Sequence, residues 1–465
     1  MAFVVDTVLG VPGVYRQPAE AAAGFPRLRT DVVGFVGVAG GNRLHEAVRL
    51  DDWRSYEEIY LRDDRGRALA APAGARLRDT VRAYFANGGS RCWVVNVAAE
   101  IVEATKLELL DRMLGASAFV DGLGVAHRRT GLELLLERRE VAIVALPELE
   151  AAVTARRVDP FRAPIADEGA FQCCAAVTGV GTVATDDVVE LGPLYAPAEV
   201  LGAQRAFLER VGRDKWRAFA LVTAPAGLAP RQVESWRAAL ASGLADADCG
   251  ALYWPWVTAA DRPGDPPRLQ PPLGFVAGIF ARRDLARGPH VAPANEPVHS
   301  VAAVERVVTD EEHGRLYAGA VNVLRPFPNR GIELWGARTL AFGRPAADIG
   351  ELGYVNVRRS LSAIERTCDF EGQRLVFEPN QALTRFVLAQ VLSQYLLGVW
   401  QSGALQGARV EDAYYVRCDA SNNPRELIEA GQLVCEIGVA IAAPAEFIVF
   451  RLGRSEGVVE LQEVG

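Results

Sequence analysis

Short apolar segments alternate with helical segments through the first half of the chain, and this alternation restricts its possible folds more than any other feature. The run VVGFVGVAG after Asp31 is typical of a buried strand that ends in a glycine turn. Further buried strands are expected at 92–98, 140–146 and 218–225, with helices at 76–87, 129–139 and 197–211. Strands separated by helices of this length predict a largely parallel sheet that is covered on both faces.

The two ends of the chain differ from this alternating region. Residues 1–28 contain three prolines and several small residues around one apolar string, which favours an extended arm over a packed unit. After residue 310, a long apolar helix is expected at 382–400 and strands at 434–442 and 446–453. Residues 457–464 are predicted to form a final strand that has no neighbouring strand in its own chain. The unpaired backbone groups of such a strand favour pairing with another subunit.

Charge and cysteine content argue against several classes of protein. The formal net charge is −8, whereas nucleic-acid binding needs clustered Lys and Arg. No signal peptide is visible, and no run approaches the ~20 apolar residues of a membrane span. The seven cysteines lack zinc-site spacing. We interpret them as small buried side chains in a reducing, cytoplasmic compartment, while the adjacent Cys173 and Cys174 leave a redox pair open.

The sequence predicts no catalytic residue, no cofactor and no metal site. The glycines from Gly34 to Gly41 do not match G-x-G-x-x-G, and they favour a tight strand exit over a dinucleotide site. His313 stands beside three acidic residues in DEEHGR, which favours a solvated turn over a metal site. No Walker A, G-x-S-x-G or H-E-x-x-H motif occurs, so an enzyme is not expected, although a triad assembled in space stays open.

Eight strings along the chain resemble the contractile phage tail sheath family and follow that family's order. PGVY stands near the N-terminus, and VRAYFANGGSRCWVVNV resembles the family's amphipathic helix, double-glycine turn and strand. The similarity is densest from residue 271 onward. The later strings are PPLGFVAGIFARRDLARGPHVAPANEPV, VNVLRPFPNRGIELWGARTL, YVNVRRSLSAIE, FEPN, VRCD and GQLVCEIGVAIAAPAEFIVFR. The chain departs from the family in the weakly acidic arm after PGVY and at roughly 150–200.

The resemblance implies an α/β subunit of mixed α+β type with several domains. It implies an N-terminal extended arm at 1–28 and mixed-sheet sheath domains at 29–310, with an outward insertion near 150–200. A C-terminal α/β sheath domain at 311–454 and a C-terminal arm strand at 455–465 complete it. Trp335, Phe377 and Phe450 are expected to be core residues.

The resemblance also implies a structural function. The chain is expected to polymerise as six-fold helical rings around an inner tube protein, either with copies of itself alone or with copies of itself and paralogous sheath subunits. Baseplate and terminator proteins would meet its ends. Contraction would drive the tube through an envelope, with assembly in the cytoplasm and a final place in a virion tail or a released particle. Nucleic acid and direct membrane insertion are not expected. The alternatives are another phage-like assembly protein, such as a capsid or tube component, and an α/β enzyme.

The terminal arms and one helix are the expected contact sites. Strand addition between subunits would hold the lattice together while the arms flex. The helix at 381–402 is expected to face the tube with a polar, lightly charged side, and to pack inward with Leu383, Val387, Val391, Tyr395 and Leu396. The arm residues are Val4, Val5, Val14, Tyr15, Val458, Val459 and Leu461. The tube-facing candidates are Arg385, Arg358, Arg359 and Gln394, and an alternative is that the arginines pair within their own domain.

Overall fold

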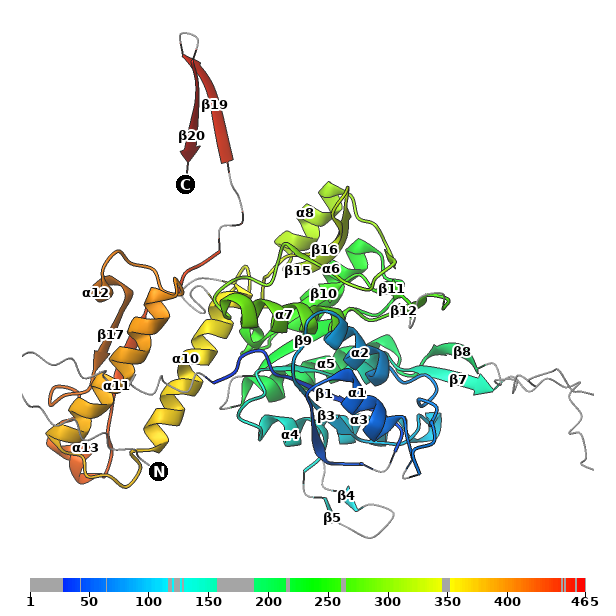
Figure 1. The fold of residues 1–465 in the computed structure, drawn as a ribbon, viewed down its shortest axis with the longest axis horizontal. Helices are drawn as coiled ribbons and strands as arrows, with labels where there is room; N and C mark the ends of the chain where they lie inside the picture. The colour runs from blue at the N-terminus through cyan, green and yellow to red at the C-terminus, as the bar shows by residue number, and fades with distance from the viewer. Residues whose placement is uncertain are drawn as a thin grey trace, which may run out of the picture.

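A nine-stranded mixed sheet forms the centre of the protein, and Figure 1 shows it in a computed structural model. The structure describes residues 28–41, 43–63, 65–115, 119–120, 126–127, 129–156, 188–214, 218–260, 265–344, 352–444, 446, 449–455 and 458–464. The strand order is β13 (Glu296–Pro297), β16 (Gly331–Trp335), β15 (Val321–Phe327), β10 (Gly250–Trp254), β9 (Phe219–Thr223), β6 (Ile143–Ala145), β1 (Val33–Gly37), β3 (Cys92–Asn96) and β2 (Ala47–Leu50).

The strands from β15 to β3 are parallel, and antiparallel strands close both edges. This confirms the largely parallel sheet that the alternation predicts. The expected boundary at residue 310 is wrong, however. Strand β15 comes after that point in the chain and pairs with β10, so it belongs to the same sheet as the strands before it.

Helices cover both faces of the sheet, because alternate residues of the central strands point into two separate apolar cores. Val36 of β1 lies in one core and Phe35 lies in the other, and both are fully buried. The first core receives α3 (Lys106–Leu114), α4 (Gly131–Leu136), α5 (Pro197–Gly212), α6 (Pro230–Ala241) and α8 (Asp310–Ala318). The second receives α1 (Trp53–Tyr60), α2 (Leu77–Ala86) and α7 (Leu273–Arg287).

Helices α2 and α7 approach closely because α7 has glycine where they cross. A Cβ atom at Gly274 would lie 2.2 Å from the carbonyl oxygen of Thr80, and one at Gly278 would lie 2.5 Å from that of Tyr84. A larger residue at either position would force the two backbones apart. The string LGFVAGIF therefore has a packing role that its sequence alone does not reveal.

Smaller sheets of two or three strands lie outside the nine-stranded sheet. Strand β11 (Val257–Ala259) lies between β12 (Arg268–Gln270) and β14 (Ala303–Val304). Strand β4 (Phe119–Val120) pairs with β5 (Ala126–His127). Strands β7 (Ala152–Arg156) and β8 (Val188–Pro193) form an antiparallel ribbon that leaves the body in Figure 1. Residues 157–187 lie outside the described residues, so the expected outward insertion stays a prediction.

A second unit follows the sheet and has its own small cores. It contains α10 (Val355–Gln373), α11 (Ala382–Gln401), α12 (Val410–Ala413), α13 (Arg425–Glu429) and the two-stranded sheet of β17 (Tyr414–Arg417) and β18 (Glu436–Val439). Figure 1 shows this unit beside the sheet, with α10 nearest to it. We refer to residues 352–444 as the C-terminal unit.

The chain ends in a hairpin of β19 (Val449–Ser455) and β20 (Val458–Val464), which stands away from the rest of the described chain in Figure 1. The expectation that the final strand has no neighbour in its own chain is therefore wrong, because β20 pairs along its whole length with β19. Val4, Val5, Val14 and Tyr15 lie outside the described residues.

Three further expectations from the sequence need correction. Phe377 is not a core residue, since its side chain is fully exposed. Trp335 is only partly buried and contacts Phe327, while the side chain of Phe450 lies outside the described residues. The acidic residues around His313 form the first turn of α8 and not a loop, where the Thr309 hydroxyl caps the helix by accepting from the Glu312 amide.

The sequence suggests no run of membrane-span length, whereas the length and composition of α11 alone would allow this helix to cross a membrane.

Two buried carboxylates lie under the sheet at η2, a short 3-10 helix (Pro147–Glu150). The Glu148 carboxylate accepts from the backbone N–H groups of Val38, Arg76 and Leu77, and it thereby joins the end of β1 to the start of α2. Burial raises the pKa of Glu148 to about 7 and that of Glu150 to about 8, although Arg76 opposes both shifts. The cavity beside Glu150 has a volume of only about 10 Å³, which is too small for a substrate.

We expect the unfolding free energy of the protein to fall as the pH rises from ~4.3 to about 8. The folded protein keeps a proton on Glu150 up to about pH 8, whereas the unfolded chain loses it near pH ~4.3. The folded state thus binds more protons between these values, and each such group lowers the unfolding free energy by up to ~1.4 kcal/mol per pH unit. Urea unfolding of Glu150→Gln should show a flatter pH dependence than the parent, with the exposed Glu426→Gln as control. An unchanged slope in Glu150→Gln would contradict this assignment.

Candidate functional site

The C-terminal hairpin leaves the body at a buried ion pair. Arg338, which follows β16, pairs with Glu446, just before the hairpin, and the two side chains are 6% and 10% exposed. The Arg338 Nε donates to the Glu446 carboxylate at 3.0 Å, and its Nη1 donates to the carbonyl oxygen of Tyr317 at 2.8 Å. The Tyr317 hydroxyl donates to the same carboxylate. We call these residues the C-terminal anchor.

Aromatic rings hold the Arg338 guanidinium from both sides. Its central carbon lies 3.7 Å from the ring centroid of Tyr317 and 3.8 Å from that of Phe342. The backbone of Arg338 is fixed as well, because the buried side chain of Asn322 in β15 accepts from its amide and donates to its carbonyl oxygen, each at 2.8 Å. A planar guanidinium makes these stacked and forked contacts together, and an ammonium group does not.

A second buried arginine holds the point where the described chain begins. Arg359 of α10 donates two hydrogen bonds to the Asp284 carboxylate of α7, at 2.9 and 2.6 Å, and a third to the carbonyl oxygen of Thr30 at 2.9 Å. Its guanidinium also lies over the ring of Phe280. Burial raises the pKa of Asp284, and Arg359 opposes that shift. We call these residues the N-terminal anchor.

The proposed role of Arg358 and Arg359 in meeting a tube is therefore wrong. Arg359 is 4% exposed and paired with Asp284, and Arg358 is 5% exposed and contacts Asp248 and Glu365. Both arginines do form ion pairs, but Asp284 and Asp248 belong to the central body, so pairing within their own domain holds only for the contact of Arg358 with Glu365. The sequence does not reveal this, because neighbouring residues of a helix usually point in different directions, whereas α10 is covered both by α7 and by the 3-10 helix that contains Asp248.

The exposed surface of α11 is more apolar than the sequence predicts. Leu388, Leu392 and Leu396 form its buried face, whereas Leu383 is 70% exposed and Val387 is 43% exposed. Phe386 is exposed too, next to Gln390 and Gln394. Arg385 is half-buried and donates to the Asn380 side chain at 2.7 Å. The expected inward face of Leu383 and Val387 and the expected purely polar outer face are both wrong, although Gln394 and part of Arg385 do reach the surface.

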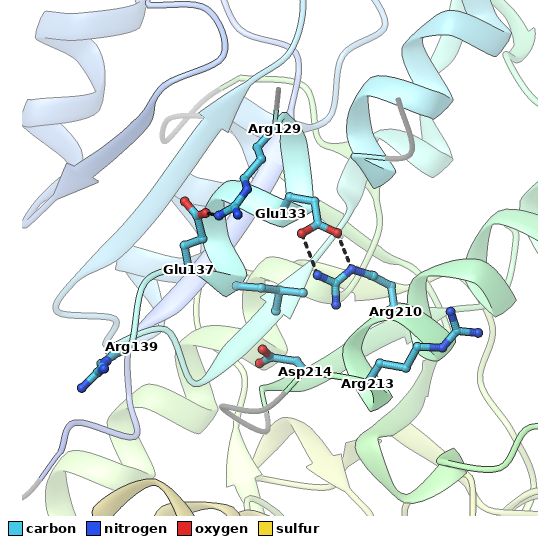
Figure 2. A pocket seen from close by; sticks show the side chains of 8 residues that line it. Arg129, Glu133, Glu137, Arg139, Arg210, Arg213 and Asp214 are labelled. Carbon is cyan, nitrogen blue, oxygen red and sulfur yellow. Dashed lines mark hydrogen bonds and ion pairs between the residues drawn. The ribbon is translucent and has the colours of Figure 1, made fainter. Parts of the chain in front are cut away.

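A polar pocket of about 630 Å³ lies between α4 and the end of α5, and Figure 2 shows the charged side chains that line it. Glu133 and Arg210 form a two-bonded ion pair across it, and Arg129 pairs with Glu137 on the same side. Arg213 and Asp214 complete the lower rim. The carboxylates that line this pocket face arginines, and its described lining holds no serine, cysteine or histidine next to a base. This arrangement suits structural ion pairs better than acid–base or nucleophilic chemistry.

Two family models match the chain. The phage tail sheath protein central domain matches residues 194–340, and the phage tail sheath C-terminal domain matches residues 351–453. Together they cover more than half of the chain. The first match ends just after the Arg338 side of the C-terminal anchor, and the second includes Glu446.

Curated relatives are similar over a shorter stretch. The tail sheath protein of Vibrio phage KVP40 is 25% identical over 207 residues, which is 44% of this chain and 29% of that protein. The tail sheath protein of Salmonella phage ViI is 27% identical over 208 residues, 44% of this chain and 31% of that protein. The chain thus matches less than a third of the length of these relatives.

Solved structures share the fold over almost the whole chain. A chain of the anti-feeding prophage helical sheath in the contracted state covers 96% of this chain and 99% of its own length, with a TM-score of 0.62 and 24% identity. A chain of the PVC sheath complex in the contracted state, from an extracellular contractile injection system, covers 97% and 99%, with a TM-score of 0.58 and 24% identity. The architecture is therefore that of these proteins from end to end.

Loss of the C-terminal anchor should release the segment before the hairpin. In Glu446→Gln, Arg338 stays buried without its charged partner, which typically costs ~3–5 kcal/mol. We expect faster hydrogen exchange at 440–443 and unchanged exchange in α7. Arg425→Lys, in an exposed ion pair with Glu429, serves as control because surface pairs contribute only ~0–1 kcal/mol. Equal exchange in Glu446→Gln and the parent would show that the anchor does not hold this segment.

Reversal of the charge in the N-terminal anchor should prevent folding. Arg359→Glu places a second carboxylate against buried Asp284 and leaves the carbonyl of Thr30 without its donor. We expect a large drop in Tm, or insoluble protein, by circular dichroism and thermal melting. The variant Arg425→Glu, at an exposed position, should change Tm little. A soluble Arg359→Glu with the parent's Tm would contradict the buried assignment.

Proposed function

Because this chain belongs to the contractile phage tail sheath family, we propose that it is a structural subunit that polymerises as stacked helical rings around an inner tube. Contraction of this sheath drives the tube through a target envelope. The two family models and the end-to-end similarity in fold support this proposal. The observation that carries it is the pair of buried arginine anchors, one at Thr30 and one at Glu446, where the described chain meets the central body.

The C-terminal hairpin supports an exchange of strands between subunits. An isolated two-stranded hairpin is marginally stable in water, and both of its outer edges offer unpaired backbone groups. A strand from another subunit satisfies those groups and stabilises the hairpin. Val458, Val459 and Leu461 lie in β20 and are our candidates for this contact, together with Val4, Val5, Val14 and Tyr15 of the N-terminal arm.

The sheet of β17 and β18 is a suitable acceptor for such strands. It has two strands of four residues each in the described part of the chain, and it packs on α11 with one face. Strand addition there joins subunits by main-chain hydrogen bonds. A head-to-tail link of this kind repeats without closing and gives a helical polymer.

We propose further partners from the same family. The exposed side of α11, with Gln394 and Arg385 beside Leu383 and Phe386, is the proposed contact with the inner tube protein. Six-fold rings, paralogous sheath subunits, and baseplate and terminator proteins at the ends complete the assembly, since a relative of the same fold belongs to the anti-feeding prophage baseplate, solved with six-fold symmetry. Assembly takes place in the cytoplasm, and the particle then forms part of a virion tail or is released. No enzymatic step is needed, because contraction uses energy stored during assembly.

Removal of either arm should leave a folded monomer that does not assemble. We expect a deletion of residues 1–20 and a deletion of residues 456–465 to retain the parent's Tm and to give no striated cylinders by negative-stain microscopy. The reason is that both deletions remove backbone partners and leave the central sheet intact. Normal cylinders from both truncated proteins would refute the proposal.

A sharper test separates backbone pairing from side-chain contacts. Val459→Pro with Leu461→Pro removes two N–H donors from β20, whereas Val459→Ala with Leu461→Ala keeps them. We expect cylinders from the alanine variant only, with monomers of equal Tm in both cases. Equal assembly of the two variants would show that the strand does not join subunits through its backbone.

A further inference from the structure

Three cysteines gather in one small core of the C-terminal unit. Cys418 follows β17, Cys435 precedes β18 and Cys368 lies in α10, and all three pack with Leu388 and Leu392 of α11. Cys418 is 6% exposed, whereas Cys435 and Cys368 are partly buried. All three carry free thiols. Nothing in the proposed sheath function uses them.

The register of the small sheet places Cys418 and Cys435 opposite each other. Arg417 of β17 pairs with Glu436 of β18, so the next pair along the ladder is Cys418 with Cys435. Farther along, the Ala440 amide donates to the carbonyl oxygen of Ala413 at 2.9 Å, which marks that pair as a hydrogen-bonded one. Because the two kinds of pair alternate, Cys418 and Cys435 occupy a non-hydrogen-bonded position.

Such a position brings side chains close enough for a disulfide. Residues opposite each other there have Cα atoms ~4.5 Å apart, within the ~4.4–6.8 Å that disulfides span. Both side chains point toward α11, since Val416 and Ile437, two positions back on each strand, belong to the same core. The two thiols are close enough for each to affect the pKa of the other.

The buried side chain of Asn423 holds the backbone just beyond this pair. Its amide nitrogen donates to the carbonyl oxygens of Asp419 and Val434, at 3.0 and 2.8 Å, and its oxygen accepts from the Val434 amide at 2.8 Å. Asn423 is 2% exposed. The strand ends on both sides of the cysteines are thus fixed before any covalent bond forms, so little movement is needed to form one.

The surroundings of the two thiols affect their pKa values differently. Burial raises the pKa of both, and for Cys435 the neighbouring Cys418 adds to the rise and brings it to about 12. For Cys418, the neighbouring Cys435 and the charge of Arg385 oppose the effect of burial. Burial raises the pKa of Cys368 to about 11, and Glu365 adds to the rise.

We propose that Cys418 and Cys435 form a disulfide when the protein meets a small-molecule disulfide such as oxidised glutathione. One thiolate attacks the glutathione disulfide, and reduced glutathione leaves. The other thiolate attacks the mixed disulfide, and a second reduced glutathione leaves. The protein loses two electrons and two protons, which the glutathione gains. The bond closes the loop of residues 419–434 and joins β17 to β18, the sheet that our proposed function names as the acceptor.

The state of Cys418 and Cys435 depends on whether the surrounding medium is reducing or oxidising. In a reducing compartment the thiols stay protonated and buried, and their exchange with other disulfides is slow. In an oxidising medium the bond removes freedom from the unfolded loop and stabilises the acceptor sheet. The disulfide itself does not depend on the proposed function, because it is formed and measured in the monomer.

The test is oxidation of the full-length monomer with oxidised glutathione at about pH 9, where more thiolate is present. We expect a loss of about 2 Da in mass, a peptide cross-link between Cys418 and Cys435, and a rise in Tm of at least ~5 °C that dithiothreitol reverses. Cys418→Ala and Cys435→Ala should each abolish the cross-link and the rise. Cys368→Ala and Cys249→Ala, which remove other buried thiols, should retain both.

Two results would overturn the assignment. One is a cross-link that runs through Cys368 in place of either partner. The other is an end product that carries only glutathione adducts, with no bond within the chain. Failure of the monomer to form cylinders would bear on the proposed function and leave this test unaffected.

Discussion

Two buried arginines fix the points at which the described ends of the chain meet the central sheet. Arg359 ties the backbone at Thr30 to α7 and α10, and Arg338 ties Glu446 to α8 and the end of β16. Each guanidinium uses several donors at once and lies against an aromatic ring. The sequence has only two lysines among its 50 cationic residues, so nearly every positive charge has this planar, forked geometry.

These anchors hold defined points of the backbone against the central sheet. A buried ion pair adds little net stability, because the cost of removing its charges from water offsets their attraction. Its geometry is nonetheless demanding, and an unpaired partner is expensive. The anchors therefore fix the path of the backbone more than they add to the free energy of unfolding.

The C-terminal unit has the opposite character. Its cores are small, its sheet has two strands in the described part of the chain, and α11 exposes Leu383 and Phe386. A unit of this kind gains much of its stability from neighbours, which suits a subunit that functions in a polymer. Cys418 and Cys435 lie in this unit, where a covalent bond between two strands has the largest effect on stability.

The sequence alone determined strands β1, β3, β6 and β9 and helices α2, α4 and α5 of the central body, because their apolar runs are strong and several of their ends are marked by glycine or proline. It also determined the family, through eight short strings in a fixed order. It did not determine the outer surface of α11, whose apolar residues occur on every side, so that periodicity cannot select a buried face.

Only the tertiary structure decided which elements meet. Strand β15 joins the sheet across residue 310, β20 pairs with β19, Arg358 and Arg359 are covered from two directions, and Cys418 stands opposite Cys435. Each of these depends on contacts between residues far apart in the chain or on strand register. Local propensity carries no information about either, because register and docking are set by the sum of all packing contacts in the folded protein.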